Sequence, residues 1–305
     1  MNFWAFGLLL SVFIWSILYE RSLLLIYALT VGFYAIMNLR NQKKALNSFR
    51  RKIQIATWND SGDPSVFGRL EVDMTKIDEF LDNYNAKNPD NKMSYTIVFA
   101  KALGAGMSSS KKLNGKICFG QFVPCDSVDL SVLVDVDGKN LGNVLLKGCN
   151  KNSLKELNDQ LKAEVKKMKT GKNEEFNEQI QTLKYIPSFV IQAMLRITSW
   201  LSYDLGLSVP PLKVKPDNFG YGVLTNVSAF GVTDCTAPLV PFCKTIIVAV
   251  MNTPQLKPVV IDNEIKIRKI MNFNITYDHR FGDGSDAVKM LKAVREVFDN
   301  PVKHL

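Results

Sequence analysis

Histidine is almost absent from this chain. Only two of the 305 residues are histidines, His279 and His304. His304 is the penultimate residue, and the last residues of a domain are often disordered. Histidine is the side chain that ordinarily exchanges a proton near neutral pH. Acid–base chemistry that relies on histidine therefore points to His279.

Paired cysteines are also missing. The five cysteines form no C-x-x-C pair, and with two distant histidines they make no zinc-binding pattern. We interpret the thiols as reduced side chains of an intracellular domain, with a disulfide as the alternative. The cysteines are Cys118, Cys125, Cys149, Cys235 and Cys243.

Acidic residues are absent from residues 40–52, a segment with six basic residues. The net charge of the whole chain is +9, so this short segment supplies most of the excess. The rest of the chain has the charge balance of an ordinary globular protein. This distribution argues against a nucleic-acid partner.

Charged residues are absent from residues 3–19 and 22–39, two mostly apolar runs separated by Glu20 and Arg21. Each run is close to the lower length limit for crossing a bilayer. We expect a transmembrane helix pair or hairpin within residues 1–39, with a buried helix pair of the fold as the alternative. A secretory signal peptide is disfavoured, because no basic residue precedes the first run and no clear cleavage site follows it.

The basic residues also predict an orientation. By the positive-inside rule, the linker of residues 40–57 and the domain of residues 58–305 lie on the cytosolic or mitochondrial-matrix side. The linker is suited to binding anionic lipid head groups. We therefore expect an integral membrane protein with membrane lipid as one partner.

From residue 58 onward the pattern is that of a globular α/β domain. Alternating apolar residues predict strands, and the hairpin turn Asp137-Gly138 joins two of them. Longer apolar periodicity predicts helices, one of which opens with the capping-box residues Ser153 and Glu156. The predicted strands cover residues 66–73, 117–123, 130–136, 141–146 and 270–277, and the helices cover residues 94–113, 153–169 and 285–299.

His279 lies at the corner between the last strand and the last helix. Gly282 and Gly284 allow tight backbone geometry there. A lone histidine in such a place is most often structural. Here it is followed by Asp283 and Gly284 in an H-x-x-x-D-G pattern. This pattern resembles the signature of the dihydrolipoamide acyltransferase core and chloramphenicol acetyltransferase superfamily.

A second landmark of that family lies upstream. Residues 220–231, GYGVLTNVSAFG, are similar to the family segment G-T-F-T-I-[ST]-N-x-G-x-[FY]-G, whose hydroxyl position falls on Thr225. Further landmarks occur in the family's order at residues 70–75, 113–114, 128–132 and 153–154. The resemblance covers roughly residues 60–301.

The resemblance implies a mixed β-sheet with helices, as in chloramphenicol acetyltransferase. It also implies coenzyme A as a thioester substrate, no metal, and active sites between the subunits of a homotrimer. By the same resemblance, His279 is the general base and Thr225 donates a hydrogen bond to the oxyanion. Asp283 orients the turn or forms an ion pair. The residues that bind coenzyme A are not implied.

The sequence departs from the family in three places. Residues 172–219 are longer than the corresponding link and include a hydrophobic helical stripe over residues 185–205. That stripe suits a membrane surface, a subunit contact or the domain's own core. No segment resembles a lipoyl or subunit-binding domain, so we expect no covalently attached lipoate. Ser228 also replaces a glycine that is common in the family's turn.

These observations predict a free-standing, membrane-anchored acyltransferase that moves an acyl group between a coenzyme A thioester and an unidentified acceptor. The alternative from another class is a catalytically inactive scaffold of the same fold, or a subunit of a larger membrane assembly. A third reading is lipid-surface binding through residues 40–52 without chemistry.

Overall fold

The structure is a computed structural model, and the residues that it describes fall into two compact units. The first unit comprises residues 1–62 and 174–200, and the second comprises residues 63–173 and 201–305. The predicted domain boundaries at residues 39 and 57 lie outside the described residues and stay predictions. The described residues are 10–15, 17, 24–32, 64–118, 121–135, 141–169, 186–208 and 217–305.

The expected membrane localisation is corrected by the structure. A bilayer span takes about 20 consecutive apolar residues in one helix. No helix within the described ranges combines the length and the apolar character that a span requires. The prediction of an integral membrane protein is therefore wrong. Within the predicted helix pair, the described helical residues are 10–15, 17 and 24–32, and the remainder of the pair lies outside the described residues.

The predicted insertion contributes a helix to the first unit. Helix α8 spans Ser188–Ser199 and continues into a π-helical turn at Trp200–Asp204. Its residue Ile197 is exposed, and so is Trp200 just after it. Whether residues 185–205 contact a membrane surface, another subunit or the domain's own core stays a prediction.

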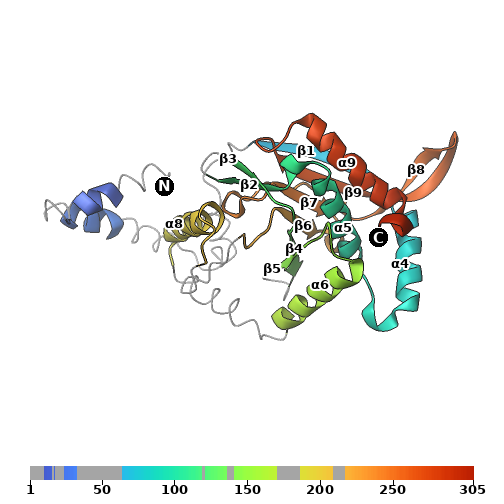
Figure 1. Ribbon diagram of the computed structural model, residues 1–305, viewed down its shortest axis with the longest axis horizontal. Helices are drawn as coiled ribbons and strands as arrows, with labels where there is room; N and C mark the ends of the chain where they lie inside the picture. Colours follow the sequence, from blue (N-terminus) through green and yellow to red (C-terminus); the bar gives the residue numbers. More distant parts are fainter. Residues whose placement is uncertain are drawn as a thin grey trace. The chain divides into compact units, whose positions relative to one another are not determined.

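The second unit is built on a mixed sheet (Figure 1). Seven strands pair in the order β1-β9-β7-β6-β4-β5, with β8 paired to β9. Strand β6 is parallel to both β4 and β7, and the other neighbours in this sheet are antiparallel. The strands are β1 (Ser65–Asp73), β4 (Leu130–Asp135), β5 (Leu141–Leu146), β6 (Gly222–Asn226), β7 (Ile247–Met251), β8 (Gln255–Ile261) and β9 (Glu264–Asp278).

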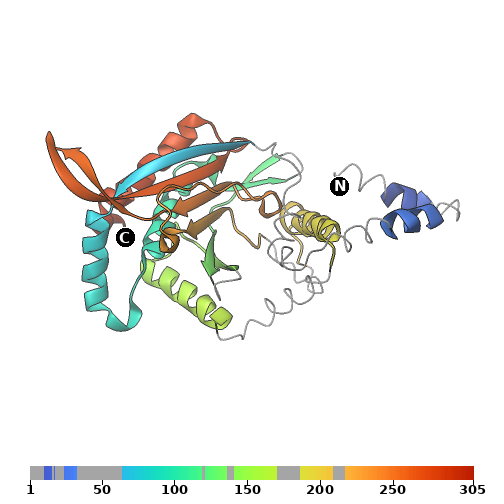
Figure 2. The ribbon, with the colours of Figure 1, turned by 180° about the vertical axis from the view of Figure 1, so that it is seen from behind.

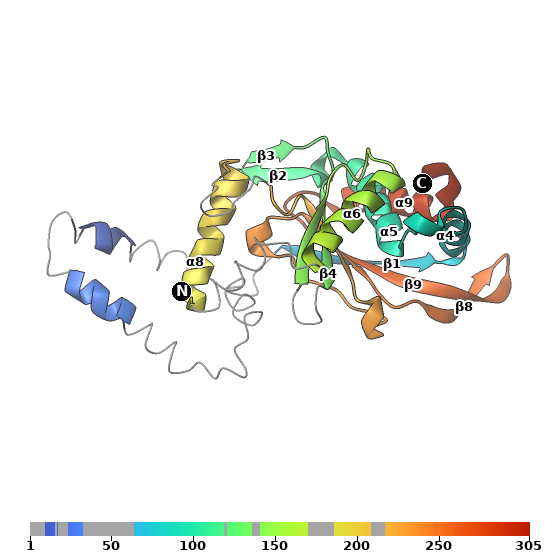
Figure 3. The same ribbon diagram turned by 90° about the horizontal axis from the view of Figure 1, so that it is seen from below.

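Helices cover one face of this sheet, which Figure 3 shows from below. Helix α5 is apolar on nearly every side because it packs against the sheet and against both α6 and α9. Gly106 of α5 permits this approach, since a Cβ atom there would lie 2.5 Å from Val294 of α9. The helices of the second unit are α4 (Thr75–Lys87), α5 (Tyr95–Ser108), α6 (Leu154–Lys169), α9 (Gly284–Asp299) and α10 (Pro301–His304), with 3₁₀ turns at Pro89–Asn91, Lys111–Leu113, Ser228–Phe230 and Pro241–Cys243.

Most of the predicted elements are confirmed. The capping box is present, because Ser153 N–H donates to the Glu156 carboxylate (2.8 Å) and Glu156 N–H donates to the Ser153 hydroxyl (3.3 Å). The turn of the β8–β9 hairpin has positive φ at Asp262 and Asn263, as a tight two-residue hairpin turn requires. This hairpin extends away from the rest of its unit (Figure 2).

The single strand predicted over residues 117–123 is wrong. The structure has two short strands instead, β2 (Gly115–Cys118) and β3 (Gln121–Pro124). They pair antiparallel, with Gly115 opposite Pro124 and Cys118 opposite Gln121, so the chain reverses between them. Apolar alternation continued through this reversal, which is why the sequence pattern did not reveal it.

The two faces of β9 differ in chemistry. Alternate side chains of a strand point to opposite faces of its sheet. One set joins the hydrophobic core under the helices, namely Met271, Phe273, Ile275 and Tyr277. The other set is polar yet buried, namely Asn272, Asn274, Thr276 and Asp278. This second set lies on the sheet face opposite the helices, here called the open face.

Candidate active site

Thr225 lies near the carboxyl end of β6, on the open face. Its partner across the parallel ladder is Val250 of β7. The side chain is half-buried. No residue in the described part of the chain is recorded as a hydrogen-bond partner of its hydroxyl, so this hydroxyl is available to donate to a ligand.

The turn after Thr225 accepts the serine that departs from the family pattern. Asn226 Oδ1 accepts hydrogen bonds from the Ser228 backbone N–H (2.9 Å) and from the Ser228 hydroxyl (2.6 Å). Left-handed backbone geometry falls on Gly231 (φ +73) and not on Ser228. A serine therefore fits this turn without strain and also closes it.

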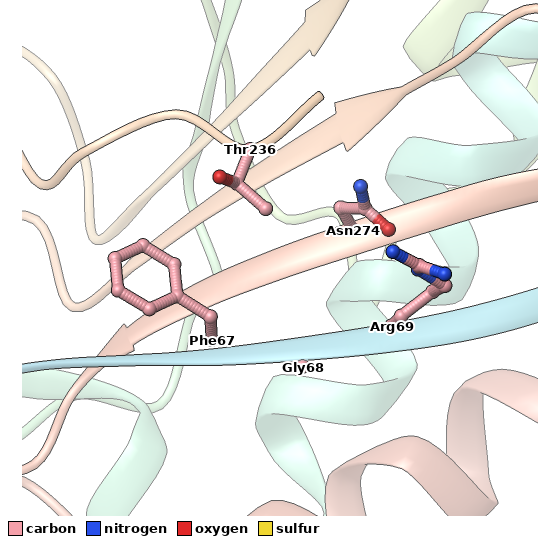
Figure 4. A pocket seen from close by; sticks show the side chains of 5 residues that line it. All are labelled: Phe67, Gly68, Arg69, Thr236 and Asn274. Atoms are coloured by element: carbon pink, nitrogen blue, oxygen red, sulfur yellow. The ribbon is translucent and has the colours of Figure 1, made fainter. Parts of the chain in front are cut away.

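Thr225 belongs to a row of side chains that crosses the open face. Residues paired directly across strands point to the same face, and the register joins Thr225 to Val250, Val250 to Asn274, and Asn274 to Arg69. A cavity of about 290 Å³ lies at the β1 end of this row. It is lined by Phe67, Gly68, Arg69, Thr236 and Asn274, whose side chains Figure 4 shows.

A loop packs onto this row and fixes it. The Asn274 amide donates to the Asp234 carboxylate (2.7 Å) and to the Cys235 carbonyl (2.8 Å). Arg69 forms an ion pair with the same Asp234. Asn252, fully buried, accepts from Cys235 N–H (2.8 Å) and donates to the Asn272 carbonyl (2.9 Å). This loop thus fixes the Asn274 and Arg69 side chains of the row.

His279 lies at the other end of the sheet, where β9 terminates. Its backbone N–H donates to the Pro64 carbonyl (2.9 Å), just before β1 begins. Its ring is exposed and lies nearly parallel to the Tyr277 ring, with centroids 6.3 Å apart and planes 23° apart. The imidazole therefore lies just past the end of β9 and is exposed. This position agrees with the predicted strand-to-helix corner.

Asp278 and Arg280 flank His279 and bind each other. The Asp278 side chain is 4% exposed and the Arg280 side chain is 64% exposed. The guanidinium Nε lies 3.0 Å from both carboxylate oxygens, and Nη2 lies 2.6 Å from Oδ2. A buried carboxylate needs such pairing, because an unpaired charge in the interior is costly.

Asp283 lies just before α9 and makes no hydrogen bond to the imidazole of His279. It is the N-cap of α9 in a capping box with Asp286. The Ser285 hydroxyl and the backbone N–H groups of Asp286 and Ser285 donate to it and lower the pKa of Asp283 to about 2. Asp286 is buried and accepts from the Ser110 hydroxyl (2.9 Å) and Lys112 (3.0 Å). Asp283 therefore stabilises the turn behind His279.

The structure brings His279 and Asp283 together at one end of the sheet and leaves Thr225 apart from them. Thr225 is level with Asn274, two strands away and five residues before His279. Strand spacings of ~4.8 Å and rises of ~3.3 Å per residue put Thr225 and His279 roughly 19 Å apart. The two side chains of a single subunit cannot act on the same reacting atoms.

At this corner, Gly282 is required by close packing and not by an unusual backbone angle. Neither Gly282 nor Gly284 has a positive φ. A Cβ atom at Gly282 would lie 3.1 Å from both Leu113 and Asp286, whereas a Cβ atom at Gly284 would meet nothing within 4 Å. Among the described residues, no group of three or more His, Cys, Asp or Glu side chains is placed to hold a metal ion.

Sequence reasoning missed Arg69, Asn274, Asp278 and Arg280. Asp278 and Arg280 adjoin His279, and their opposite charges two residues apart were a signal that could have been used. Arg69 and Asn274 meet only through the β1–β9 register, so no local pattern connects them.

The chain is similar to acyltransferase components of dehydrogenase complexes. It is 22% identical over 238 residues to the dihydrolipoyllysine-residue succinyltransferase component of the 2-oxoglutarate dehydrogenase complex of Haemophilus influenzae, covering 77% of this chain and 48% of that protein. The mitochondrial counterpart of Saccharomyces cerevisiae is 24% identical over 272 residues, covering 88% of this chain and 47% of that protein. The chain thus spans about half the length of these relatives.

Solved structures share the fold. A probable dihydrolipoamide acetyltransferase from Listeria monocytogenes superposes with a TM-score of 0.59 at 17% identity, covering 85% of this chain and 92% of that one. The cubic core of a pyruvate dehydrogenase multienzyme complex superposes with a TM-score of 0.60 at 13% identity, covering 84% of this chain and 88% of that one. The dihydrolipoamide acetyltransferase of Azotobacter vinelandii superposes with a TM-score of 0.59 at 14% identity, covering 87% of this chain and 90% of that one. In that enzyme a serine, a histidine and an asparagine four positions after the histidine have been studied for their role in the catalytic mechanism.

These superpositions confirm the predicted mixed α/β acyltransferase fold. The family model of the 2-oxoacid dehydrogenases acyltransferase catalytic domain matches residues 39–186 and 213–305, which include Thr225, His279 and Asp283. The chain belongs to the 2-oxoacid dehydrogenases acyltransferase (catalytic domain) family.

Proposed function

We propose that this protein transfers an acyl group between a coenzyme A thioester and a thiol acceptor of the dihydrolipoamide type, in sites formed between the subunits of a homotrimer. His279 of one subunit is the general base and Thr225 of the next is the oxyanion donor. The observation that carries the proposal is the placement of these two side chains. Each is accessible on its own end of the sheet, and roughly 19 Å separates them within one chain.

The chemistry follows from the two groups. The His279 imidazole takes the proton from the acceptor thiol, whose sulfur attacks the thioester carbonyl carbon. The carbonyl oxygen becomes an oxyanion and accepts a hydrogen bond from the Thr225 hydroxyl. When the tetrahedral intermediate collapses, the bond to the coenzyme A sulfur breaks, and the imidazolium returns the proton to that sulfur. No metal is needed for this sequence.

One similar protein supports the roles that we propose for His279 and Asp283. The Azotobacter vinelandii acetyltransferase has a histidine and an asparagine four positions apart among its studied residues, and His279 and Asp283 have the same spacing. Asparagine and aspartate are both strong helix N-caps. The role that we assign to Asp283, capping α9 behind the base, is therefore one that either residue can fill.

The proposal is tested by acyl transfer from acetyl-CoA or succinyl-CoA to dihydrolipoamide, with the acylated product and free coenzyme A measured by mass spectrometry. His279→Ala is expected to lower the rate by a factor on the order of 10²–10⁴. His304→Ala is the matched control, because it removes the other histidine, whose ring lies 3.3 Å from Glu296 at the chain end. A His279→Ala variant as active as the wild type would refute the base. A wild type that binds no coenzyme A and transfers no acyl group would favour the inactive scaffold.

A further inference from the structure

His279 is bracketed by an ion pair that nothing in the acyl-transfer chemistry above uses. The Asp278 carboxylate accepts the backbone N–H of Arg280 (2.9 Å) as well as the guanidinium. The two carboxylate oxygens and the two guanidinium nitrogens form a fork-to-fork contact, which fixes direction as well as distance. The contact joins residue 278 to residue 280 and so closes a ring around the backbone of residue 279.

The Asp278–Arg280 ion pair lies where the hydrogen bonds of the sheet end. Asp278 N–H donates to the Ile246 carbonyl (2.9 Å), and His279 N–H donates to the Pro64 carbonyl (2.9 Å). After these bonds the chain turns, with Phe281 N–H donating to the Asp278 carbonyl (3.1 Å). Residue 279 is therefore the last position that the sheet holds, and the ion pair is the next restraint along the chain.

The imidazole itself has no orienting partner in the described part of the chain. The recorded contact of its ring is the parallel Tyr277 ring. The carboxylates near this corner are engaged elsewhere. Asp283 caps α9, and Asp286 accepts from Ser110 and Lys112. A base usually needs a group that fixes its direction, and among the residues that the structure describes no carboxylate supplies this directly.

We propose that Asp278 and Arg280 are positioning residues that hold the backbone of residue 279, so that the imidazole is aimed out of the sheet edge toward the reacting thiol. This inference rests on the proposed role of His279 as the base. The Asp278–Arg280 pair acts through the backbone and touches no reacting atom. Arginine suits the task better than lysine, because its planar fork fixes both carboxylate oxygens at once.

The kinetic test uses Arg280→Ala, because the Arg280 side chain is largely exposed and guanidinium from solution can take its place beside the Asp278 carboxylate. We expect kcat to fall roughly tenfold or more, since small displacements of a positioned group are costly, while KM for acyl-CoA stays within about twofold. Added guanidinium chloride at low, non-denaturing concentration should restore much of kcat, and equal sodium chloride should not. Arg295→Ala, which removes an exposed arginine of α9, is the control.

A second measurement reads the backbone without any assay of activity. Labelling histidine with ¹⁵N gives two backbone amides, of residues 279 and 304. In Arg280→Ala the amide of residue 279 should exchange with solvent faster than in the wild type, and guanidinium should slow it again. The amide of residue 304 should not change.

The outcomes separate this inference from the proposed function. A rise in KM with kcat unchanged would overturn it and make Arg280 a substrate contact. Unchanged exchange at residue 279 would also overturn it. If the wild type proves inactive, the proposed function fails, yet faster exchange at residue 279 that guanidinium reverses would still support the positioning role.

Discussion

Asp283 fixes the start of α9, close to the proposed base. Its oxygen accepts Ser285 N–H (2.9 Å), the Ser285 hydroxyl (2.7 Å) and Asp286 N–H (3.3 Å). These donors include N–H groups that the first turn of α9 would otherwise leave unpaired. The negative charge also lies at the positive end of the helix. The start of α9 is thereby fixed four residues after His279.

The cap has a predictable pH dependence. The pKa of Asp283 in the folded protein, about 2, lies below the ordinary aspartate value of about 3.9. Asp283 therefore stabilises the fold fully above about pH 4, and this contribution is lost as the pH falls toward 2. Asp283→Ala should lower the melting temperature by roughly 2–4 °C at pH 7 and by less near pH 2.5.

Asp283→Asn is the matched control for the cap, since asparagine also caps helices but carries no charge. It should keep most of the melting temperature at pH 7. A difference between wild type and Asp283→Ala that stays constant from pH 7 to pH 2.5 would show that the carboxylate does not act as assigned.

At the scale of elements, the position of Thr225 depends on how β6 enters the sheet. Gly220 lies two residues before β6 and has φ +61, a conformation that residues with a side chain rarely adopt. A Cβ atom there would lie 2.3 Å from the Asp129 carbonyl oxygen. Tyr221 N–H donates to that same carbonyl (2.9 Å), which docks the start of β6 beside β4.

Gly220→Ala should therefore destabilise the protein by at least ~2 kcal/mol, through both strain and the clash with Asp129. Gly284→Ala is the control, because a Cβ atom there meets nothing within 4 Å and φ is not positive. Chemical denaturation of both variants measures the difference. Equal stabilities would mean that the entry to β6 is not held as described.

The sequence predicted those elements whose signals are local. The alternation of residues 66–73, the capping box at Ser153 and the strand before His279 are all confirmed, because each depends on residues close together in the chain. The β2–β3 reversal was missed, since apolar residues continue through it. The row of Thr225, Asn274 and Arg69 could not be predicted, because only the sheet's register brings these residues together.

At the scale of the whole molecule, the proposed site is incomplete within one chain. Thr225 and His279 lie at opposite ends of the sheet, and the family of this chain is that of acyltransferase catalytic domains. Association of identical subunits in a closed ring brings two different surfaces together at every junction. A composite site at each junction would unite the Thr225 end of one sheet with the His279 corner of the next.

The measurement that tests this account most directly is complementation between two inactive variants. Thr225→Ala and His279→Ala, carrying different affinity tags, are co-expressed, and trimers that contain both are isolated by the two tags in succession. Trimers of either variant alone lack a complete site. A mixed trimer has one junction where an intact Thr225 meets an intact His279.

The account predicts about one third of wild-type acyl transfer in the mixed trimers, since one of three junctions is complete. Separately purified variants mixed without subunit exchange should show no recovery. Mixed trimers no more active than the single variants, beside an active wild type, would contradict the composite site.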